Sequence, residues 1–220
     1  MSLFALATAV ALAAPGTRPP GTLPALPDAP PFAGHAQPLP ADIITKMTGV
    51  TWREGCPVPL SGLAWLEVRH WGLDGTAHTG HIIVANDHAD AILGVFEALW
   101  GARFPIHTVR PAHEFGGDDN AMMRANNTSA FNCRPVAGSS RFSDHSYGYA
   151  LDLNPLINPY VRGDKVSPPQ GRAYLDRDAD IPGLIHADGP VVAAFAAAGW
   201  PWGGNWTRAK DYQHFSATGR

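Results

Sequence analysis

The sequence predicts an α+β fold with a small antiparallel sheet and helices packed on one side of it. Two observations support this class. Short segments with strand-like alternation and two segments with helical spacing do not follow the strand–helix–strand rhythm of a parallel sheet. Glycine (23 residues) and proline (21 residues) are abundant in a chain of 220 residues, which favours loops and short elements over long helices.

Two segments are predicted to form the sheet. Residues 63–71 alternate, with Leu66 and Val68 on one side and polar side chains between them, which is typical of a half-buried strand. A turn at Asp74-Gly75 follows, and the apolar residues 80–85 then form a second candidate strand. The two segments are therefore predicted to pair as a wide hairpin.

The remaining elements are predicted from local spacing. Residues 89–101 carry apolar side chains at helical intervals, and residues 190–199 start with a proline and end with a glycine, as helices often do. Residues 106–110 and 149–153 are expected to be short strands. Residues 116–127 are rich in Gly, Asp and Asn, which predicts a polar loop.

The first 40 residues are predicted to lie outside the folded domain. Residues 1–14 resemble a signal peptide, because their apolar run is too short to span a bilayer and Ala11-Leu12-Ala13 supplies a small-x-small cleavage signal. Residues 15–40 are rich in proline and predict an extended linker without a ladder of hydrogen bonds. Residues 41–220 are then the domain. We expect the protein to be secreted or held in the cell envelope without a stable membrane span.

Cys56 and Cys133 are the only cysteines. In an exported chain an even number of cysteines favours a disulfide, although two buried free thiols are the alternative. The formal net charge is −3, which offers no basic surface for a phosphate backbone. Nucleic acid is therefore not an expected partner.

Two short motifs near the C-terminal half carry residues suited to metal chemistry. His145 and Asp152 lie in a Ser-x-His-x2-Gly-x-Ala-x-Asp stretch, where Gly148 permits a sharp turn between a loop and a strand. Asp211 and His214 follow in an Asp-x2-His motif. A loop histidine and a strand carboxylate could converge on one metal ion together with the second histidine.

The number of groups fits a catalytic zinc site, which needs three protein ligands, an open position and a base that is not a ligand. His145, Asp152 and His214 would hold Zn²⁺, and Asp211 would accept a proton from the attacking water. Spacing alone leaves open a structural alternative, in which these are hydrogen-bonded core histidines and capping aspartates. Ser143 and His145 are only two residues apart, which is poor geometry for a serine hydrolase.

Together the motifs resemble the M15 family of zinc D-alanyl-D-alanine peptidases, and in particular its secreted carboxypeptidase-like branch. The resemblance extends from about Thr48 to Phe215, and its most specific parts are Ser143-x-His145-x2-Gly148-x-Ala150-x-Asp152, Gly199-Trp-Pro-Trp-Gly-Gly-Asn-Trp206 and Asp211-x2-His214.

The resemblance implies a hedgehog/DD-peptidase-like fold, Zn²⁺ as cofactor and the same residue roles. The zinc ligands of the family map onto His145, Asp152 and His214, and its catalytic base maps onto Asp211. This agrees with the assignment made from chemistry alone.

The resemblance also implies an arginine upstream of the first histidine that binds the scissile carbonyl or a substrate carboxylate. Arg134 matches best, and Arg141 and Arg124 are weaker candidates. Such a guanidinium can stabilise an oxyanion and grip a carboxylate bidentately. Ser143 is expected either to donate to substrate or to brace the metal ligand. Trp202 is expected either to line a substrate cleft or to pack in the core.

The implied function is hydrolysis of peptide bonds involving D-amino acids in peptidoglycan stem peptides, with D-alanyl-D-alanine carboxypeptidase activity expected first. The alternatives are an endopeptidase that cuts between L-Ala and D-Glu, and a non-catalytic zinc-stabilised module that binds the cell wall. Presence of Asp211 favours an enzyme, because a purely structural metal needs no base. The expected partner is the stem peptide, and we expect the chain to act as a monomer.

Overall fold

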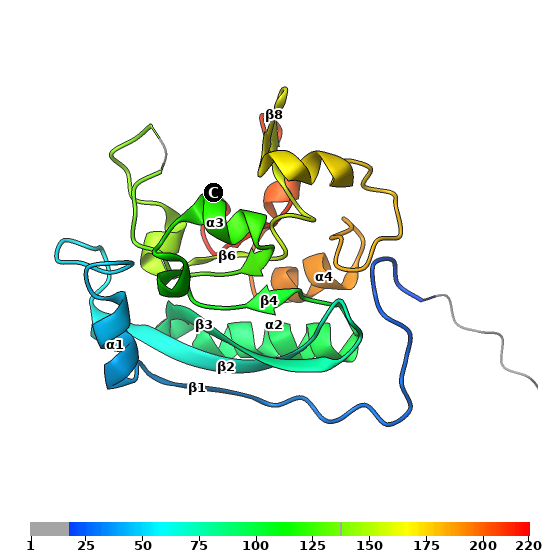
Figure 1. The fold of residues 1–220 in the computed structure, drawn as a ribbon, viewed down its shortest axis with the longest axis horizontal. Coiled ribbons are helices and arrows are strands. Elements are labelled where there is room, and N and C mark those ends of the chain that lie inside the picture. The colour runs from blue at the N-terminus through cyan, green and yellow to red at the C-terminus, as the bar shows by residue number, and fades with distance from the viewer. Residues whose placement is uncertain (1–17, 137) are drawn as a thin grey trace, which may run out of the picture.

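The computed structural model describes residues 18–136 and 138–220, and it shows a mixed α+β architecture built from small sheets and short helices (Figure 1). The four α-helices of this described part are α1 (Ala41–Met47), α2 (Ala89–Gly101), α3 (Asp119–Arg124) and α4 (Pro190–Ala197). Its strands are β1 (Gly34–Pro38), β2 (Leu63–Trp71), β3 (Ala77–Ala85), β4 (Thr108–Val109), β5 (Asn127–Thr128), β6 (Ala150–Asp152), β7 (Tyr160–Arg162), β8 (Lys165–Ser167), β9 (Lys210–Asp211) and β10 (His214–Ser216). The predicted α+β class is confirmed.

The largest sheet has the order β1-β2-β3, and both of its pairings are antiparallel. Strands β2 and β3 form the predicted hairpin, and β3 begins earlier than expected, at Ala77. Strand β1 comes from the proline-rich segment and pairs with β2 over five residues, from Gly34 opposite Val68 to Pro38 opposite Ala64. The expectation that residues 15–40 cannot form a hydrogen-bonded ladder is therefore wrong for residues 34–38. Every β1 side chain is exposed, so the pairing partner rather than an apolar pattern determines this strand.

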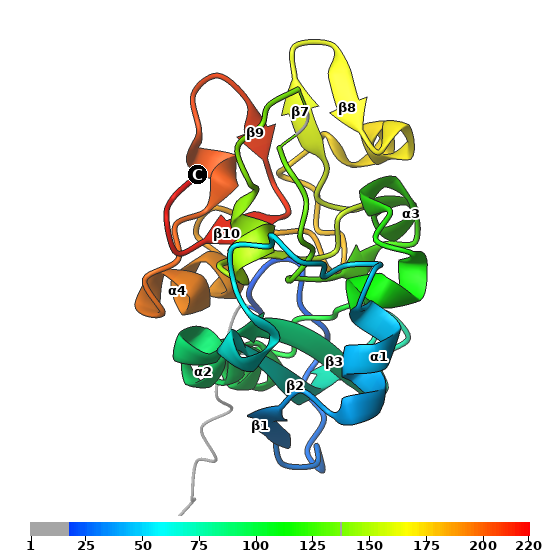
Figure 2. The same ribbon diagram turned by 90° about the vertical axis from the view of Figure 1, so that its left-hand side faces the viewer.

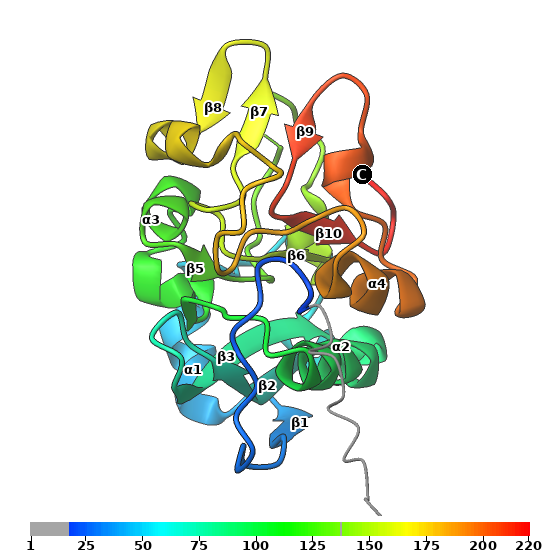
Figure 3. The ribbon, with the colours of Figure 1, turned by 90° about the vertical axis from the view of Figure 1, so that its right-hand side faces the viewer.

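Helices pack on both faces of this sheet (Figures 2 and 3). Leu66 and Val68 of β2 face the main core, which contains residues of α2 and α4. Trp65, one position along the same strand, faces a second cluster that contains Ile43 and Met47 of α1. The prediction of helices on one side thus holds for α2 and α4, whereas α1 lies on the opposite face.

The second half of the chain builds smaller sheets above the first (Figure 1). Strands β6 and β10 form an antiparallel pair, and β8-β7-β9 form a three-stranded antiparallel sheet. Strands β4 and β5 form a short parallel pair. These small sheets bring residues near 150 and residues near 214 side by side, which matters for the site described below.

Two local predictions differ from the structure. Residues 116–127 contain the helix α3, where a loop was expected, because the Asp118 carboxylate accepts hydrogen bonds from the backbone N–H groups of Asn120 and Ala121 and so caps the helix. The strand predicted at residues 106–110 is shorter and covers only Thr108–Val109.

Cys56 and Cys133 form a disulfide, as predicted, at a sequence separation of 77. The predicted signal peptide, residues 1–14, lies outside the described residues. Within the described residues, none of the helices is both long enough and apolar enough to span a membrane.

Candidate metal centre

The three predicted metal ligands lie together in the structure. His145, Asp152 and His214 each offer one ligand atom, and these atoms lie within 4.8 Å of one another. The His145 Nε2 atom is 3.4 Å from Asp152 Oδ2, and the His214 Nδ1 atom is 2.9 Å from Asp152 Oδ1. The carboxylate therefore lies between the two imidazoles and presents one oxygen to each.

Backbone register explains why residues so distant in sequence meet. Asp152 of β6 lies directly opposite His214 of β10 in the antiparallel pair. His145 lies in a short 3-10 helix, Asp144–Tyr147, that ends at Gly148 with a φ of 72°. A Cβ atom at Gly148 would lie 2.4 Å from the backbone nitrogen of Ala85, so only glycine allows this turn to pack against β3.

The outer nitrogen of each imidazole is bound to a backbone oxygen. His145 Nδ1 lies 2.6 Å from the carbonyl oxygen of Ala130, and His214 Nε2 lies 2.9 Å from the backbone oxygen of Arg220. Because a backbone oxygen can only accept, each of these nitrogens carries a proton and donates it outward. The other nitrogen of each ring, His145 Nε2 or His214 Nδ1, faces Asp152, so that either a proton or a metal ion can lie between the ring and the carboxylate.

The electrostatics of the trio favour a positive charge at its centre. Burial acts to raise the pKa of Asp152, but the charges and hydrogen bonds of His145 and His214 outweigh it and hold that pKa well below its usual range. Burial likewise opposes the charged form of His214, yet Asp152 and Asp211 together raise the pKa of His214 to about 9. A proton or a metal cation can meet this demand for positive charge.

Asp211 lies beside the trio and has the character of a base. It is on β9, and burial raises the pKa of its carboxyl group to about 6 against the attraction of His214. The side-chain N–H of Gln213 donates to Asp211 Oδ1 at 3.1 Å. Gly203 lies close to the backbone of Asp211. A Cβ atom at position 203 would be only 2.8 Å from the backbone oxygen of Asp211, so glycine permits this close approach.

The donor set fits a divalent metal ion. Two neutral imidazole nitrogens and one ionised carboxylate are ligands that zinc accepts, and three protein ligands leave a fourth position for water or substrate. Outward hydrogen bonds from metal-bound histidines to backbone oxygens are the arrangement that fixes ring orientation in such sites. The residues present therefore suit Zn²⁺, and Asp211 is available as a group that is not a ligand.

Arg134 is placed against the turn that carries His145. The backbone N–H of Ser143 donates to the carbonyl oxygen of Arg134 at 3.0 Å. The Arg134 guanidinium forms an ion pair through Nε with the Asp119 carboxylate of α3, and the Asn132 side chain donates to the same carboxylate at 3.0 Å. The guanidinium is thus held at its Nε end.

The other predicted substrate residues have different surroundings. Ser143 caps the 3-10 helix, its hydroxyl accepting from the backbone N–H of His145 at 3.4 Å, which is the bracing role. Arg141 and Arg124 are exposed. Trp202 is only 6% exposed and donates to the backbone oxygen of Tyr212. The substrate-contact role expected for Trp202 is therefore not supported, because its ring packs in the core.

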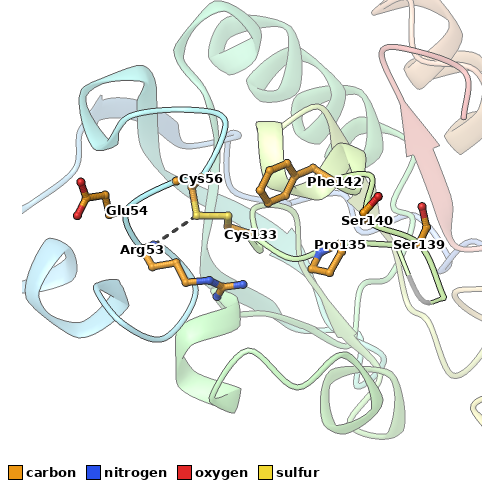
Figure 4. A pocket seen from close by; sticks show the side chains of 9 residues that line it. Arg53, Glu54, Cys56, Cys133, Pro135, Ser139, Ser140 and Phe142 are labelled. Carbon is orange, nitrogen blue, oxygen red and sulfur yellow. Dashed lines mark hydrogen bonds between the residues drawn. A yellow bond between two sulfur atoms is a disulfide. The ribbon is translucent and has the colours of Figure 1, made fainter.

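A pocket of about 300 Å³ lies next to this region (Figure 4). The disulfide between Cys56 and Cys133 forms part of its wall, and Arg53 and Phe142 line it from either side. Cys133 directly precedes Arg134, and Phe142 directly precedes Ser143. The pocket is therefore bounded by the two segments that lead into the candidate site, although none of the three metal-site side chains lines it.

Sequence reasoning missed four contributors to the site. Asp119 holds Arg134, and Gln213 holds Asp211. Both lie near predicted residues in the sequence, but only the fold determines their partners. The backbone oxygens of Ala130 and Arg220 have no sequence signal, since every residue carries one. Trp206 ends the Gly199–Trp206 motif, which gave no role to its ring, and in the structure its ring centroid is 5.5 Å from that of His214.

Comparison with known proteins adds one finding. A family model described as D-alanyl-D-alanine carboxypeptidase, of the M15 peptidases, matches residues 137–217. Searches of curated proteins and of solved structures gave no match. The matched segment contains all three ligand candidates and Asp211 but not Arg134, whose role still depends on the resemblance and on geometry. The segment that holds the metal-site residues is thus similar to the M15 peptidases.

Proposed function

We propose that this protein is an exported zinc metallopeptidase that removes the terminal D-Ala from peptidoglycan stem peptides. The observation that carries the proposal is the pair of outward hydrogen bonds that direct His145 Nε2 and His214 Nδ1 toward Asp152. Two ring nitrogens directed at one carboxylate give the set of three neighbouring donor atoms that a zinc site requires. The match of the family model to this segment supports the same conclusion.

Zinc, when bound by His145, Asp152 and His214, supplies a Lewis acid that polarises the scissile carbonyl and lowers the pKa of water. The residues of the chain supply the remaining parts of the reaction. The Asp211 carboxylate accepts the proton of the attacking water, and the raised pKa suits this group for returning the proton to the leaving amine. The reaction then releases D-Ala and the shortened peptide.

Arg134 is assigned to the substrate carboxylate or the developing oxyanion. Its Nε is engaged by Asp119, so the two terminal nitrogens are the donors directed to substrate. A carboxypeptidase must recognise a terminal carboxylate, and a guanidinium does so with two parallel hydrogen bonds. Stem peptides with a free terminal D-Ala offer such a carboxylate, which favours them over internal bonds.

The experiment uses the full chain with its disulfide intact. Chelator-treated protein is loaded with Zn²⁺ and incubated with a stem pentapeptide, and the products are identified by mass spectrometry. We expect release of D-Ala by the wild type, no release after chelation, recovery on return of Zn²⁺, and no release by Asp211→Ala. Asp188→Asn, a change at an exposed aspartate, serves as the matched control and is expected to keep wild-type activity.

Other products would contradict the proposal in defined ways. Cleavage between L-Ala and D-Glu would identify an endopeptidase instead. Binding of the stem peptide without any product from either wild type or Asp211→Ala would identify a non-catalytic module.

A further inference from the structure

A second group of metal-ligating side chains lies on the largest sheet, away from the site described above. His35 of β1, Glu67 of β2 and His81 of β3 occupy directly opposed positions on three neighbouring strands. Figure 2 shows these strands lying side by side. Side chains in register on adjacent strands point to the same face of a sheet, so the three lie together on one face.

The contacts within this group are specific. His81 Nε2 is 3.3 Å from Glu67 Oε2, and His35 Nδ1 is 4.0 Å from Glu67 Oε1. The His81 ring stacks on Trp65 with the ring centroids 4.7 Å apart, which orients its nitrogens. The exposed fraction of the side chain is 56% for His35, 45% for Glu67 and 37% for His81, so an ion can reach all three from solvent.

The residue types repeat those of the candidate metal centre. There too a carboxylate lies between two imidazoles and presents one oxygen to each nitrogen, at 3.4 and 2.9 Å. In a tetrahedral zinc site, ligands at about 2.0–2.2 Å from the ion lie about 3.3–3.5 Å from each other. The separation of 3.3 Å between His81 and Glu67 already has this value. Unlike those of the candidate metal centre, the ligand atoms of these three residues do not all lie within 4.8 Å of one another, so the exposed His35 side chain must turn toward the other two when an ion binds.

We propose that His35, Glu67 and His81 form a second binding site for a divalent transition-metal ion, with Zn²⁺ as the natural probe. Two imidazoles and one carboxylate select ions of this class over Ca²⁺ and Mg²⁺, which prefer all-oxygen sites. Water completes the coordination. The nearest cationic side chain on β2 is Arg69, whose guanidinium is held by the backbone oxygen of Pro31 at 2.7 Å.

Occupancy of this site has a structural consequence for β1. All five residues of β1 are exposed, so the strand gains little from apolar burial and is held mainly by its pairing with β2. A metal ion bound jointly by His35 and the two inner strands ties β1 to the sheet. Because the ion binds only the folded form, it adds to the stability of the protein.

The test is a calorimetric titration of Zn²⁺ into the chelator-stripped full chain. We expect the wild type to bind one more equivalent of Zn²⁺ than His35→Gln, and His81→Gln to behave as His35→Gln does. His78→Gln is the matched control, because His78 is an exposed histidine on the same strand and has a carboxylate partner, Asp74, at 3.0 Å. This control is expected to keep the wild-type number of bound ions.

The same comparison in a His214→Ala background separates this site from the candidate catalytic centre. In that background the chain is expected to bind one Zn²⁺ and to melt at a higher temperature when it is present, and both effects are expected to disappear with His35→Gln. Equal stoichiometry in wild type and His35→Gln would overturn the proposal, as would loss of the extra equivalent in His78→Gln. Because the readout is the difference of one equivalent, the result does not depend on whether the chain is a peptidase.

Discussion

Gln213 shows how a single amide can influence the candidate base. Its side chain is 4% exposed, and its N–H group donates to Asp211 Oδ1, while its own side-chain oxygen is buried without a hydrogen-bond partner among the described residues. A hydrogen bond to a carboxylate favours the ionised form. Gln213 therefore opposes the effect of burial, which raises the pKa of Asp211 to about 6.

We predict that Gln213→Met raises the pKa of Asp211 further, because it removes the donor and keeps a side chain of similar length. Asp211 must be ionised to accept a proton, so activity increases with pH as the carboxyl group loses its proton. In the wild type this rise lies no higher than about pH 6, since a bound cation also favours the carboxylate. The rise should move to higher pH in the variant, as measured by kcat/KM against pH. An unchanged profile, equal to that of the exposed-site control Gln170→Met, would contradict the prediction.

At the scale of single residues, the sequence identified the side chains that the structure brings together but not the groups that support them. His145, Asp152, Asp211 and His214 lie in two motifs whose residue types are those that zinc chemistry requires. The oxygens that orient the rings belong to the backbone of Ala130 and Arg220, whose side chains play no part in the contact. Only the folded structure shows that these two backbone oxygens face the imidazoles.

At the scale of elements, the turn at Gly148 joins the site to the large sheet. Its φ of 72° lies in the left-handed region, and the backbone oxygen of Gly148 accepts a hydrogen bond from the N–H of Ala85 at the end of β3. The same turn sets the positions of His145 before it and Asp152 after it.

We predict that Gly148→Ala destabilises the protein by at least about 2 kcal/mol, from backbone strain and from contact with the backbone of β3. The free energy of unfolding from denaturant titration measures this effect. Gly94→Ala is the matched control: it lies inside α2 with open space around its Cα, so alanine there should be neutral or stabilising by up to about 1 kcal/mol. Similar free energies for the two variants would show that Gly148 is not required by the packing.

The elements that the sequence predicted well are those in which apolar residues recur at regular spacing. Strand β2 matches residues 63–71 and helix α2 matches residues 89–101, because each buries a regular set of side chains. Helix α3 buries only Met122 and is six residues long, so its polar composition predicted a loop. Strand β1 buries none of its side chains and exists because β2 offers it a hydrogen-bonding edge.

At the scale of the whole molecule, the pH dependence of stability reflects a buried histidine far from the site in sequence. His70 of β2 is 4% exposed, and burial lowers its pKa to about 4. In the unfolded chain this group has its ordinary pKa near 6.5. Below about pH 6.5 the unfolded state therefore binds the proton more readily, and the folded state loses stability as the pH falls toward 4.

We predict that the wild type loses about 3 kcal/mol more stability than His70→Gln between pH 7 and pH 4, since one pKa unit corresponds to about 1.4 kcal/mol. Chemical denaturation at the two pH values, carried out on metal-free protein, measures the difference. Other carboxylates and histidines titrate in both proteins and cancel in the comparison. Equal losses in the two proteins would mean that His70 is charged in the folded state.

The disulfide also has a consequence for how the protein must be prepared. Cys133 is the residue before Arg134, and the backbone N–H of Cys133 donates to the carbonyl oxygen of Thr51, so the sulfur bridge and this contact fasten one segment to the other. Protein made in a reducing cytoplasm would lack the disulfide, and the segment that carries Arg134 would then be held less firmly. Weak turnover from such a preparation would then reflect the oxidation state of the sample and would not test the proposed activity.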